Sequence, residues 1–282
     1  MNQVFDFKRF TLLVAKHWNE NRKKYLLGLV AMAGLLFFWY GFMLIVDGGQ
    51  RIFENMQVMT YFFGLALTGC FYGSILFAEL SSGPKAMNYL IFPASHLEKL
   101  VCGLLYGVVL FFIAYTLVFY IVDIPMVMLG NSLHKSNYPG EAVSRTTEIV
   151  NIFWKTYSDE GPRTDSNLHG LFILMYFAVQ SAYILGSVYF PRFSFIKTTI
   201  SLLLVALLIS FYLAKVLQPM LPDGGHYMSL TSFRIFENND FNQQKIVSLP
   251  GWTNNTLTFL LKFAFAPIFW VVTYFRFKEK EV

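Results

Sequence analysis

The sequence predicts an all-α integral membrane protein with six transmembrane helices. Of its 282 residues, 55% are hydrophobic and only 14% are charged, whereas a soluble domain usually carries about 25% charged residues. An apolar run of about 20 residues spans a hydrocarbon core roughly 30 Å thick. Runs of this kind lie at Tyr25–Val46, Gln57–Leu80, Leu100–Val122, Leu168–Tyr189, Thr198–Leu217 and Thr256–Phe275. We therefore expect one six-helix transmembrane domain over residues 25–282.

The segment before the first span, residues 1–24, predicts an amphipathic basic helix. Its apolar residues recur at spacings of three and four, while most of its Lys and Arg residues lie elsewhere on the turn. The apolar stripe consists of Phe7, Phe10, Leu13, Val14 and Trp18. Such a helix suits the cytoplasmic headgroup layer. A charged leader that only sets the topology is the alternative. No small-residue cleavage site follows the first apolar run, so we interpret that run as a permanent span.

The distribution of Lys and Arg predicts that both termini are cytoplasmic. With this orientation the short inner segments hold most of the basic residues, as the positive-inside rule expects. The net charge of +5 is then a topology signal. No basic cluster is interleaved with base-stacking aromatic residues, so we expect membrane lipids and no nucleic acid as partners. The predicted location is the cytoplasmic (inner) membrane, with several membrane crossings.

Two long segments, 130–167 and 218–255, are predicted to be outer loops. Both are rich in polar residues and glycine, yet both contain aromatic clusters. Loops of this size with apolar content usually fold onto something. We expect a segment such as Ala142–Tyr157 to form a short helix on the outer face.

Small residues recur at intervals of four in three of the predicted spans. They are Gly69 and Gly73, Gly103 and Gly107, and Ala178, Ala182 and Gly186. This spacing lets helix backbones approach closely. We interpret these residues as packing surfaces within the chain, with a dimer interface as the alternative.

Few polar side chains fall inside the predicted spans. Gln180 lies in the middle of the fourth span, where we expect it to make an interhelical hydrogen bond. Gln180 and Lys262, which is about two turns into the sixth span, are candidates for facing a cavity. Lys215 lies near a helix end and is expected to extend to the headgroups. Asp123, at the end of the third span, is expected to be hydrated.

Known catalytic motifs are missing from the sequence. It contains no Walker A pattern, no H-E-x-x-H, no G-x-S-x-G and no paired-Cys metal motif,. We therefore predict no catalytic, cofactor-binding or metal-binding residue in this chain. If the protein consumes energy, another chain must bind the nucleotide.

The charged stretch Glu79–Leu100 separates the second and third spans. Ser95 and Glu98 have the spacing of a capping box, which would begin the third span abruptly. Pro93 disfavours helix at the residue before it. Upstream, Pro84–Phe92 could form two turns of helix with apolar residues on one face. A simple alternative is that any hairpin between two transmembrane helices needs a break and a cap.

The order of residues in this stretch resembles the loop between spans two and three of the ABC-2 type permease family, the membrane subunits of type V ABC exporters. An acidic and a basic residue lead through an aliphatic pair to Pro, a small residue and Ser, and then to an acidic residue and Lys. The form FPASHLEK is most similar to permease-like proteins common in Bacteroidetes. The matching residues are Glu79, Lys85, Leu90, Ile91, Pro93, Ala94, Ser95, Glu98 and Lys99.

The resemblance implies that residues 80–99 form a coupling loop on which a separate ABC ATPase subunit docks. ATP and Mg²⁺ would be bound by that ATPase, and this chain would carry no cofactor. A second copy or a similar permease would pair with it in the membrane. The complex would export an amphiphilic substrate such as a lipid, a peptide or a drug-like molecule.

Two other functions are compatible with the same composition. One is a membrane anchor or sensory subunit that binds partners through its outer loops and transports nothing. The other is an intramembrane enzyme acting on a lipid, which the lack of a catalytic cluster disfavours.

Overall fold

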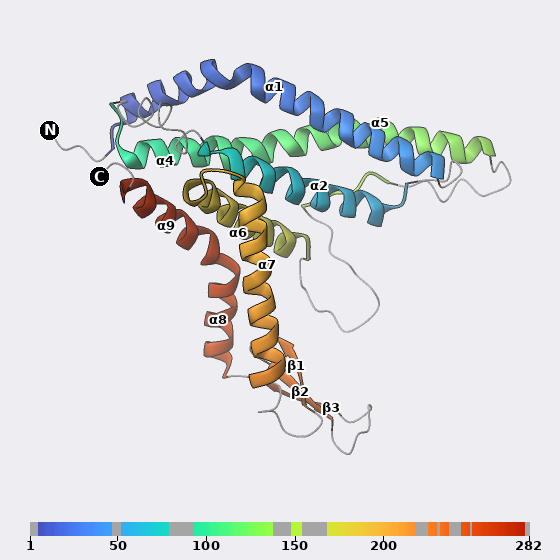
Figure 1. Ribbon diagram of the computed structural model, residues 1–282. Helices are drawn as coiled ribbons and strands as arrows, with labels where there is room; N and C mark the ends of the chain where they lie inside the picture. The colour runs from blue at the N-terminus through green and yellow to red at the C-terminus, as the bar shows by residue number, and fades with distance from the viewer. Residues whose placement is uncertain are drawn as a thin grey trace.

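Long helices form most of the chain in the computed structural model (Figure 1). Within the part of the chain that the structure describes, five helices are long and apolar enough to cross a membrane. A sixth crossing is present if α8 (Gly251–Phe263) and α9 (Phe265–Glu279), which meet at a bend of 52°, form one span. The chain is thus a helical protein of multi-pass membrane character. The structure describes residues 5–46, 52–78, 93–137, 148–153, 168–217, 225–229, 232–236, 244–248 and 250–279.

The predicted N-terminal helix and first span form a single helix, α1 (Phe7–Val46). Its 40 residues correspond to about 60 Å at 1.5 Å per residue, twice the thickness of a hydrocarbon core. The N-terminal part changes direction relative to the rest of the helix (Figure 1). Leu13 is buried, whereas Phe7 and Trp18 remain exposed. Part of the apolar stripe therefore packs on the protein.

The third span is also longer than predicted. Helix α4 (His96–Leu104), the π-helical segment η2 (Leu105–Leu110) and α5 (Phe111–Asn137) follow one another as one 42-residue unit. It begins near the predicted start, but its end lies well beyond Val122, so the first part of the predicted 130–167 loop is helical. Pro125 lies inside α5 without ending it.

The helices pack around α2 (Glu54–Ile75) and α6 (Leu168–Tyr189), which lie against each other. Helix α1 packs on α5, and α9 packs on α6. The largest core cluster joins α1, α2, α5 and the segment 148–153. A second cluster joins the end of α2 with η2, α6 and α9.

The small residues in the spans lie at close helix contacts within the chain. A Cβ atom at Gly69 would be 2.5 Å from the Tyr176 hydroxyl, and one at Gly103 would be 2.5 Å from Phe77 Cζ. A Cβ atom at Gly186 would overlap Thr198 of α7 (Ser194–Tyr212). These residues serve the intramolecular packing that their spacing indicates.

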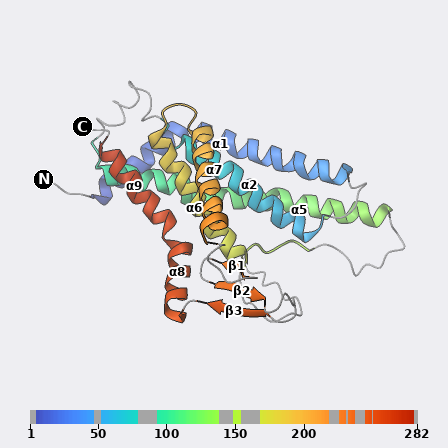
Figure 2. The ribbon, with the colours of Figure 1, turned by 60° about the horizontal axis from the view of Figure 1, so that its bottom comes forward.

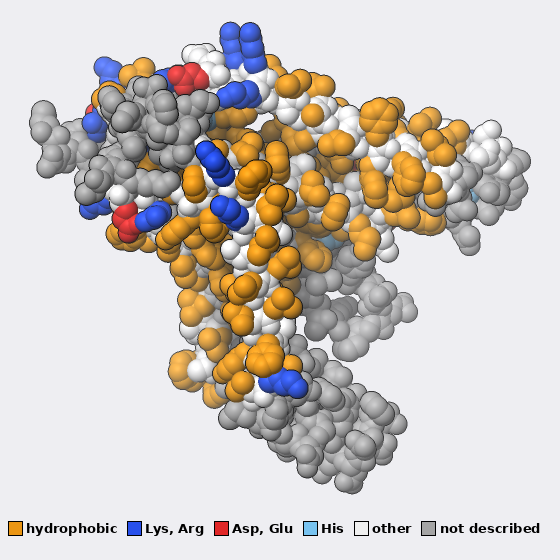
Figure 3. Space-filling view, in the orientation of Figure 1, with side chains coloured by type: hydrophobic (Ala, Val, Ile, Leu, Met, Phe, Trp, Pro, Cys, Tyr) orange, Lys and Arg blue, Asp and Glu red, His pale blue; other side chains and the backbone are white. Residues whose placement is uncertain are grey.

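Helices α7 and α8 leave the layer of α1, α2 and α5 at a steep angle (Figure 1). In α7 only Thr198 is buried, and in α8 no residue is buried. The π-helical segment η4 (Leu213–Leu217) continues α7. Hydrophobic side chains cover the visible face of both helices (Figure 3). Their apolar surfaces are thus available to lipid or to another protein chain.

The predicted loop 218–255 contains a three-stranded antiparallel sheet, which was not predicted from the sequence. Strands β1 (Gly225–Ser229), β2 (Ser232–Phe236) and β3 (Gln244–Ser248) pair in the order β1-β2-β3. Phe233 of β2 lies opposite Tyr227 of β1 and Val247 of β3. The sheet and α8 lie away from α1 and α5 in both views (Figures 1 and 2).

The predicted helix over Ala142–Tyr157 is wrong where the structure describes it. Residues 148–151 form no regular helix, and Ile152 and Phe153 lie in a turn. Val150 and Ile152 are nonetheless buried in the largest core cluster. The apolar content of this segment therefore packs inward without helix formation.

Candidate functional site

The part of the charged stretch before α4 that the structure describes begins at Pro93. Glu79, Lys85, Leu90 and Ile91, and the predicted helix over Pro84–Phe92, lie outside the described residues. Pro93 is exposed, Ala94 and Ser95 are half-buried, and Glu98 and Lys99 are buried.

The capping box predicted for Ser95 and Glu98 is confirmed. The Ser95 Oγ atom accepts a hydrogen bond from the Glu98 backbone N–H at 3.2 Å. The Ser95 backbone N–H donates to Glu98 Oε2 at 2.9 Å. Ser95 has the extended backbone of an N-cap residue, with φ −68° and ψ 155°. The reciprocal bonds satisfy two N–H groups that a helix start leaves without partners.

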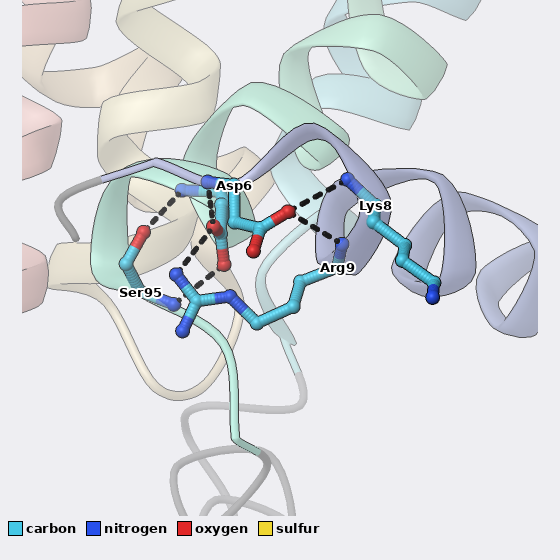
Figure 4. Close-up of polar contacts among 5 residues, drawn as sticks. Asp6, Lys8, Arg9 and Ser95 are labelled. Atoms are coloured by element: carbon cyan, nitrogen blue, oxygen red, sulfur yellow. Dashed lines mark hydrogen bonds and ion pairs between the residues drawn. The ribbon is translucent and has the colours of Figure 1, made fainter. Parts of the chain in front are cut away.

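The same carboxylate also binds the start of α1 (Figure 4). Glu98 Oε1 accepts a hydrogen bond from the Asp6 backbone N–H at 2.7 Å. It also pairs with the Arg9 guanidinium at 3.1 Å. Glu98 is 0% exposed and the Arg9 side chain is 40% exposed. One side chain therefore joins the beginnings of two helices that are 92 residues apart in the chain.

Asp6 places the start of α1 on this carboxylate. Its Oδ1 atom accepts from the backbone N–H groups of Lys8 at 2.8 Å and Arg9 at 3.4 Å, which is the hydrogen bonding of a helix N-cap. We name Asp6, Arg9, Ser95 and Glu98 the α1–α4 junction. The sequence patterns alone indicated neither the role of Asp6 nor a partner for Arg9. The signal available was the Asp immediately before the apolar stripe.

The Glu98 carboxylate lies among fixed hydrogen-bond donors. A carboxylate that accepts several N–H donors, one of them a guanidinium, forms short and strong charge-assisted hydrogen bonds. The positive end of the α4 dipole adds to this stabilisation. These hydrogen bonds replace the water molecules that would hydrate the Glu98 carboxylate in an unfolded chain. The junction therefore holds two helix ends together.

Apolar contacts extend the junction along both helices. Leu13 of α1 packs with Cys102 and Tyr106 in a separate core cluster. The Tyr106 hydroxyl donates to the Val14 carbonyl at 3.0 Å. Farther along α1, Tyr25 stacks on Tyr106 with ring centroids 5.7 Å apart. Helix α1 is thus attached to α4 and η2 over several turns.

Lys99 is 2% exposed. Together with Glu98 it was expected to belong to a surface on which a partner docks. Both side chains are buried in the protein, so they anchor the C-terminal end of the charged stretch. A partner would instead contact residues of the stretch that precede Glu98.

Gln180 makes the interhelical hydrogen bond predicted for it. Its Nε2 atom donates to the Gly107 carbonyl at 2.8 Å, and its side chain is fully buried. Gly107 belongs to η2, where the wider π-helical turn changes the pairing of backbone carbonyls. Lys262 is exposed on α8, as is Lys215 on η4. The assignment of Lys262 to a cavity stays a prediction.

The expectation that Asp123 is hydrated is wrong. Asp123 is fully buried, and its Oδ1 atom accepts a hydrogen bond from the Tyr40 hydroxyl at 2.6 Å. The error comes from the length of α5, which continues past Asp123 and packs against α1. Among the described residues, no group of three or more His, Cys, Asp or Glu side chains could hold a metal ion.

Comparisons with known proteins identified no similar protein. No family model matches the chain, and searches of curated proteins and of solved structures found no match.

Proposed function

We propose that the chain is the transmembrane permease subunit of an ABC exporter. Two permease chains, identical or similar, pair in the cytoplasmic membrane, and separate ATPase subunits bind beneath them. Hydrolysis of ATP by those subunits moves an amphiphilic substrate, such as a lipid, a peptide or a drug-like molecule, between the permease chains.

The α1–α4 junction is the observation that carries this proposal. A membrane subunit driven by a soluble ATPase needs a stiff connection between the docking surface and its long helices. Glu98 provides such a connection, because its carboxylate accepts hydrogen bonds from Asp6 and Ser95, which directly precede α1 and α4. Each helical unit continues for about 60 Å from this point, 40 and 42 residues respectively,. A displacement at the junction is transmitted to the far end of both.

The distribution of charge supports a cytoplasmic position for the junction. The starts of α1 and α4 and the end of α9 lie at one end of the molecule (Figures 1 and 2). On the face shown in Figure 3, Lys and Arg side chains gather near this end. Short basic segments favour the cytoplasmic side of a membrane.

The burial of the described residues supports a division of roles within residues 80–99. Glu98, Lys99 and Ser95 hold the end of the stretch on the membrane domain. Lys85, Leu90 and Ile91 are then the residues that contact the ATPase. Exposed apolar faces on α7 and α8 supply surface for the second permease chain and for lipid.

Co-purification in a mild detergent tests the proposal. We expect an ABC ATPase subunit to stay bound to the wild-type chain and to be lost from the Leu90→Asp/Ile91→Asp double variant. Leu133→Asp, at an exposed site near the far end of α5, is the control and retains the ATPase. The proposal fails if no ATPase is recovered with the wild-type chain under conditions that preserve the helical fold.

One observation favours a second function. The sheet of β1, β2 and β3 shows that part of the predicted outer loop 218–255 is folded, and a folded outer element is typical of a partner-binding surface. A membrane anchor or sensory subunit would use this sheet. Such a subunit would co-purify with a partner that deletion of residues 225–248 releases, and with no ATPase.

A further inference from the structure

The turn between α6 and α7 gathers cationic side chains from three parts of the fold. Lys197 of α7 lies over the Phe190 ring, with its Nζ atom 5.7 Å from the ring centroid. Arg276 of α9 lies over the preceding ring, that of Tyr189, at 4.8 Å. Contacts of this kind hold a cation against an aromatic face. Two cations from different helices are therefore held beside the end of α6, and Arg192 follows in the turn itself.

The charge of this region is positive and only partly balanced. Residues 185–200 and 270–279 contain four Lys and Arg residues and a single acidic residue, Glu279. Glu279 pairs with Nη1 of Arg276 at 2.5 Å. The Nε atom of the same guanidinium has no hydrogen-bond partner among the described residues. The region thus has an excess of positive charge that an anion would balance.

The beginning of α7 adds hydrogen-bond donors to this charge. No side chain in the described part of the chain caps the helix, whose N-cap residue is Phe193. The Ser194 hydroxyl is also without a hydrogen-bond partner among the residues that the structure describes. Backbone N–H groups at a helix start carry partial positive charge and bind phosphate groups. Arg192 and Lys197 lie within one turn of this start and add full charges to it.

Phe193 has a backbone conformation that its side chain disfavours. Its φ is 55° and its ψ is 41°, in the left-handed region, where an L-residue other than Gly is strained. The ring is nevertheless 75% exposed, so packing within the described part of the chain does not offset the strain. An exposed aromatic ring beside cations is typical of segments that insert into the headgroup layer of a membrane.

The position of the turn favours a lipid over a soluble anion. Helices α6 and α7 are both long and apolar enough to cross a membrane. Four residues, 190–193, join them, so the turn lies where two crossings meet the membrane surface. Phospholipid headgroups lie at the same level. Lys and Arg side chains gather near this end of the molecule, and hydrophobic side chains follow along α7 (Figure 3).

We propose that the α6–α7 turn and the adjoining part of α9 form a binding site for the phosphate of an anionic phospholipid. Arg192, Lys197 and Arg276 supply positive charge, the start of α7 supplies N–H donors, and the Phe193 ring enters the lipid beside the headgroup. A zwitterionic headgroup fits less well, because its own cation is repelled by the three basic side chains. The site requires only this chain and a membrane, so it is independent of the proposed export function.

Photoaffinity labelling of the full-length chain in detergent micelles tests the inference. The probe is phosphatidylglycerol with a diazirine in its headgroup. Mass spectrometry should locate most of the label on residues 189–197 and 270–279. Unlabelled phosphatidylglycerol should compete, whereas phosphatidylcholine and inorganic phosphate at the same concentration should not. Label spread over all exposed helices, or equal competition by phosphatidylcholine or by phosphate, overturns the inference.

Two double variants with the same loss of charge distinguish a site from general attraction. Arg192→Gln/Lys197→Gln should weaken phosphatidylglycerol binding roughly thirtyfold, the combined contribution of two cations at a membrane surface. Lys135→Gln/Lys215→Gln removes two exposed cations from other helix ends and should leave the binding unchanged. An equal loss in both double variants would indicate diffuse electrostatic attraction and contradict the site.

Phe193→Gly tests the site in a variant whose fold should be preserved. Glycine adopts the left-handed conformation without strain, so the melting temperature should rise or stay unchanged. Binding of phosphatidylglycerol should nevertheless fall several-fold, because no ring enters the lipid. Unchanged binding together with a raised melting temperature would show that this turn only connects two helices, which overturns the inference.

Discussion

Glu98 combines three roles in one side chain. It completes the capping box with Ser95, receives the first N–H group of the α1 start from Asp6, and pairs with Arg9. A buried carboxylate is stable only when its lone pairs are bound by donors. The described neighbours supply such donors from two helix starts.

Replacing Glu98 by Gln should lower the free energy of unfolding by about 1–3 kcal/mol. The variant loses hydrogen bonds to a charged group, and the new side-chain NH₂ group faces a backbone or guanidinium N–H donor. Thermal denaturation of the purified chain, followed by tryptophan fluorescence, measures the change. The control is Glu20→Gln, which removes an exposed i,i+4 pair with Lys16 at 3.8 Å and should cost less than about 0.5 kcal/mol.

The two Glu→Gln variants also separate a coupling role from a purely structural one. If the junction couples the ATPase to the helices, Glu98→Gln lowers transport more than it lowers ATP hydrolysis by the assembled complex. Parallel loss of both activities, in proportion to the folded protein recovered, would assign Glu98 a structural role alone.

At the scale of elements, the contact between α2 and α6 depends on glycine. Tyr176 of α6 lies over Gly69, so its hydroxyl and ring occupy the space of a side chain. One turn later, a Cβ at Gly73 would lie 3.4 Å from the Gln180 carbonyl oxygen. The two glycines let the helices approach more closely than larger residues would allow.

Gly69→Ala should destabilise the chain by about 1–3 kcal/mol, the usual cost of overpacking. Gly28→Ala is the control, because nothing lies within 4 Å of a Cβ at that exposed position of α1. Alanine there should be neutral or stabilise the helix by up to about 1 kcal/mol. Melting temperatures in detergent measure both. Equal shifts of the melting temperature in the two variants would show that the α2–α6 contact has room for a side chain at Gly69.

At the scale of the whole molecule, α2, α5 and α6 bury much of their apolar surface, whereas the projecting helices α7 and α8 do not. Helices α2, α5 and α6 share buried clusters, whereas α7 and α8 expose nearly all of their apolar side chains. A second permease chain beside α7 and α8 would enclose part of this surface. Lys262 of α8 would then lie at the boundary between two chains.

Lys262→Met tests this arrangement in the assembled complex. If Lys262 faces a path between two permease chains, its replacement should change substrate-stimulated ATPase activity several-fold, since intramembrane charges usually mark such paths. Lys215→Met is the control, because Lys215 is also exposed and lies where its ammonium can reach the headgroups. Identical activity in the wild type and both variants would assign Lys262 to the lipid interface.

Sequence patterns predicted the parts of the fold that depend on local chemistry. Apolar runs revealed the membrane helices, and the Ser95–Glu98 spacing revealed the start of α4. Both follow from interactions within a few residues. The limits of α5 were missed because Asp123 and the polar residues after Pro125 indicate a helix end in isolation. In the folded chain, the contact of α5 with α1 and the hydrogen bond from Tyr40 stabilise the continuation.

By itself, the sequence determined that the chain is helical, crosses a membrane several times and caps α4 at Ser95, because hydropathy and capping act over short distances along the chain. Only the tertiary structure decided that Glu98 also binds Asp6 and Arg9, and that Gln57 and Tyr120 bind the backbone of residues 148–152. Partners in these contacts are separated by 30 to 93 residues. Such pairs are chosen by helix packing, which brings a buried polar group to the one partner that can satisfy it.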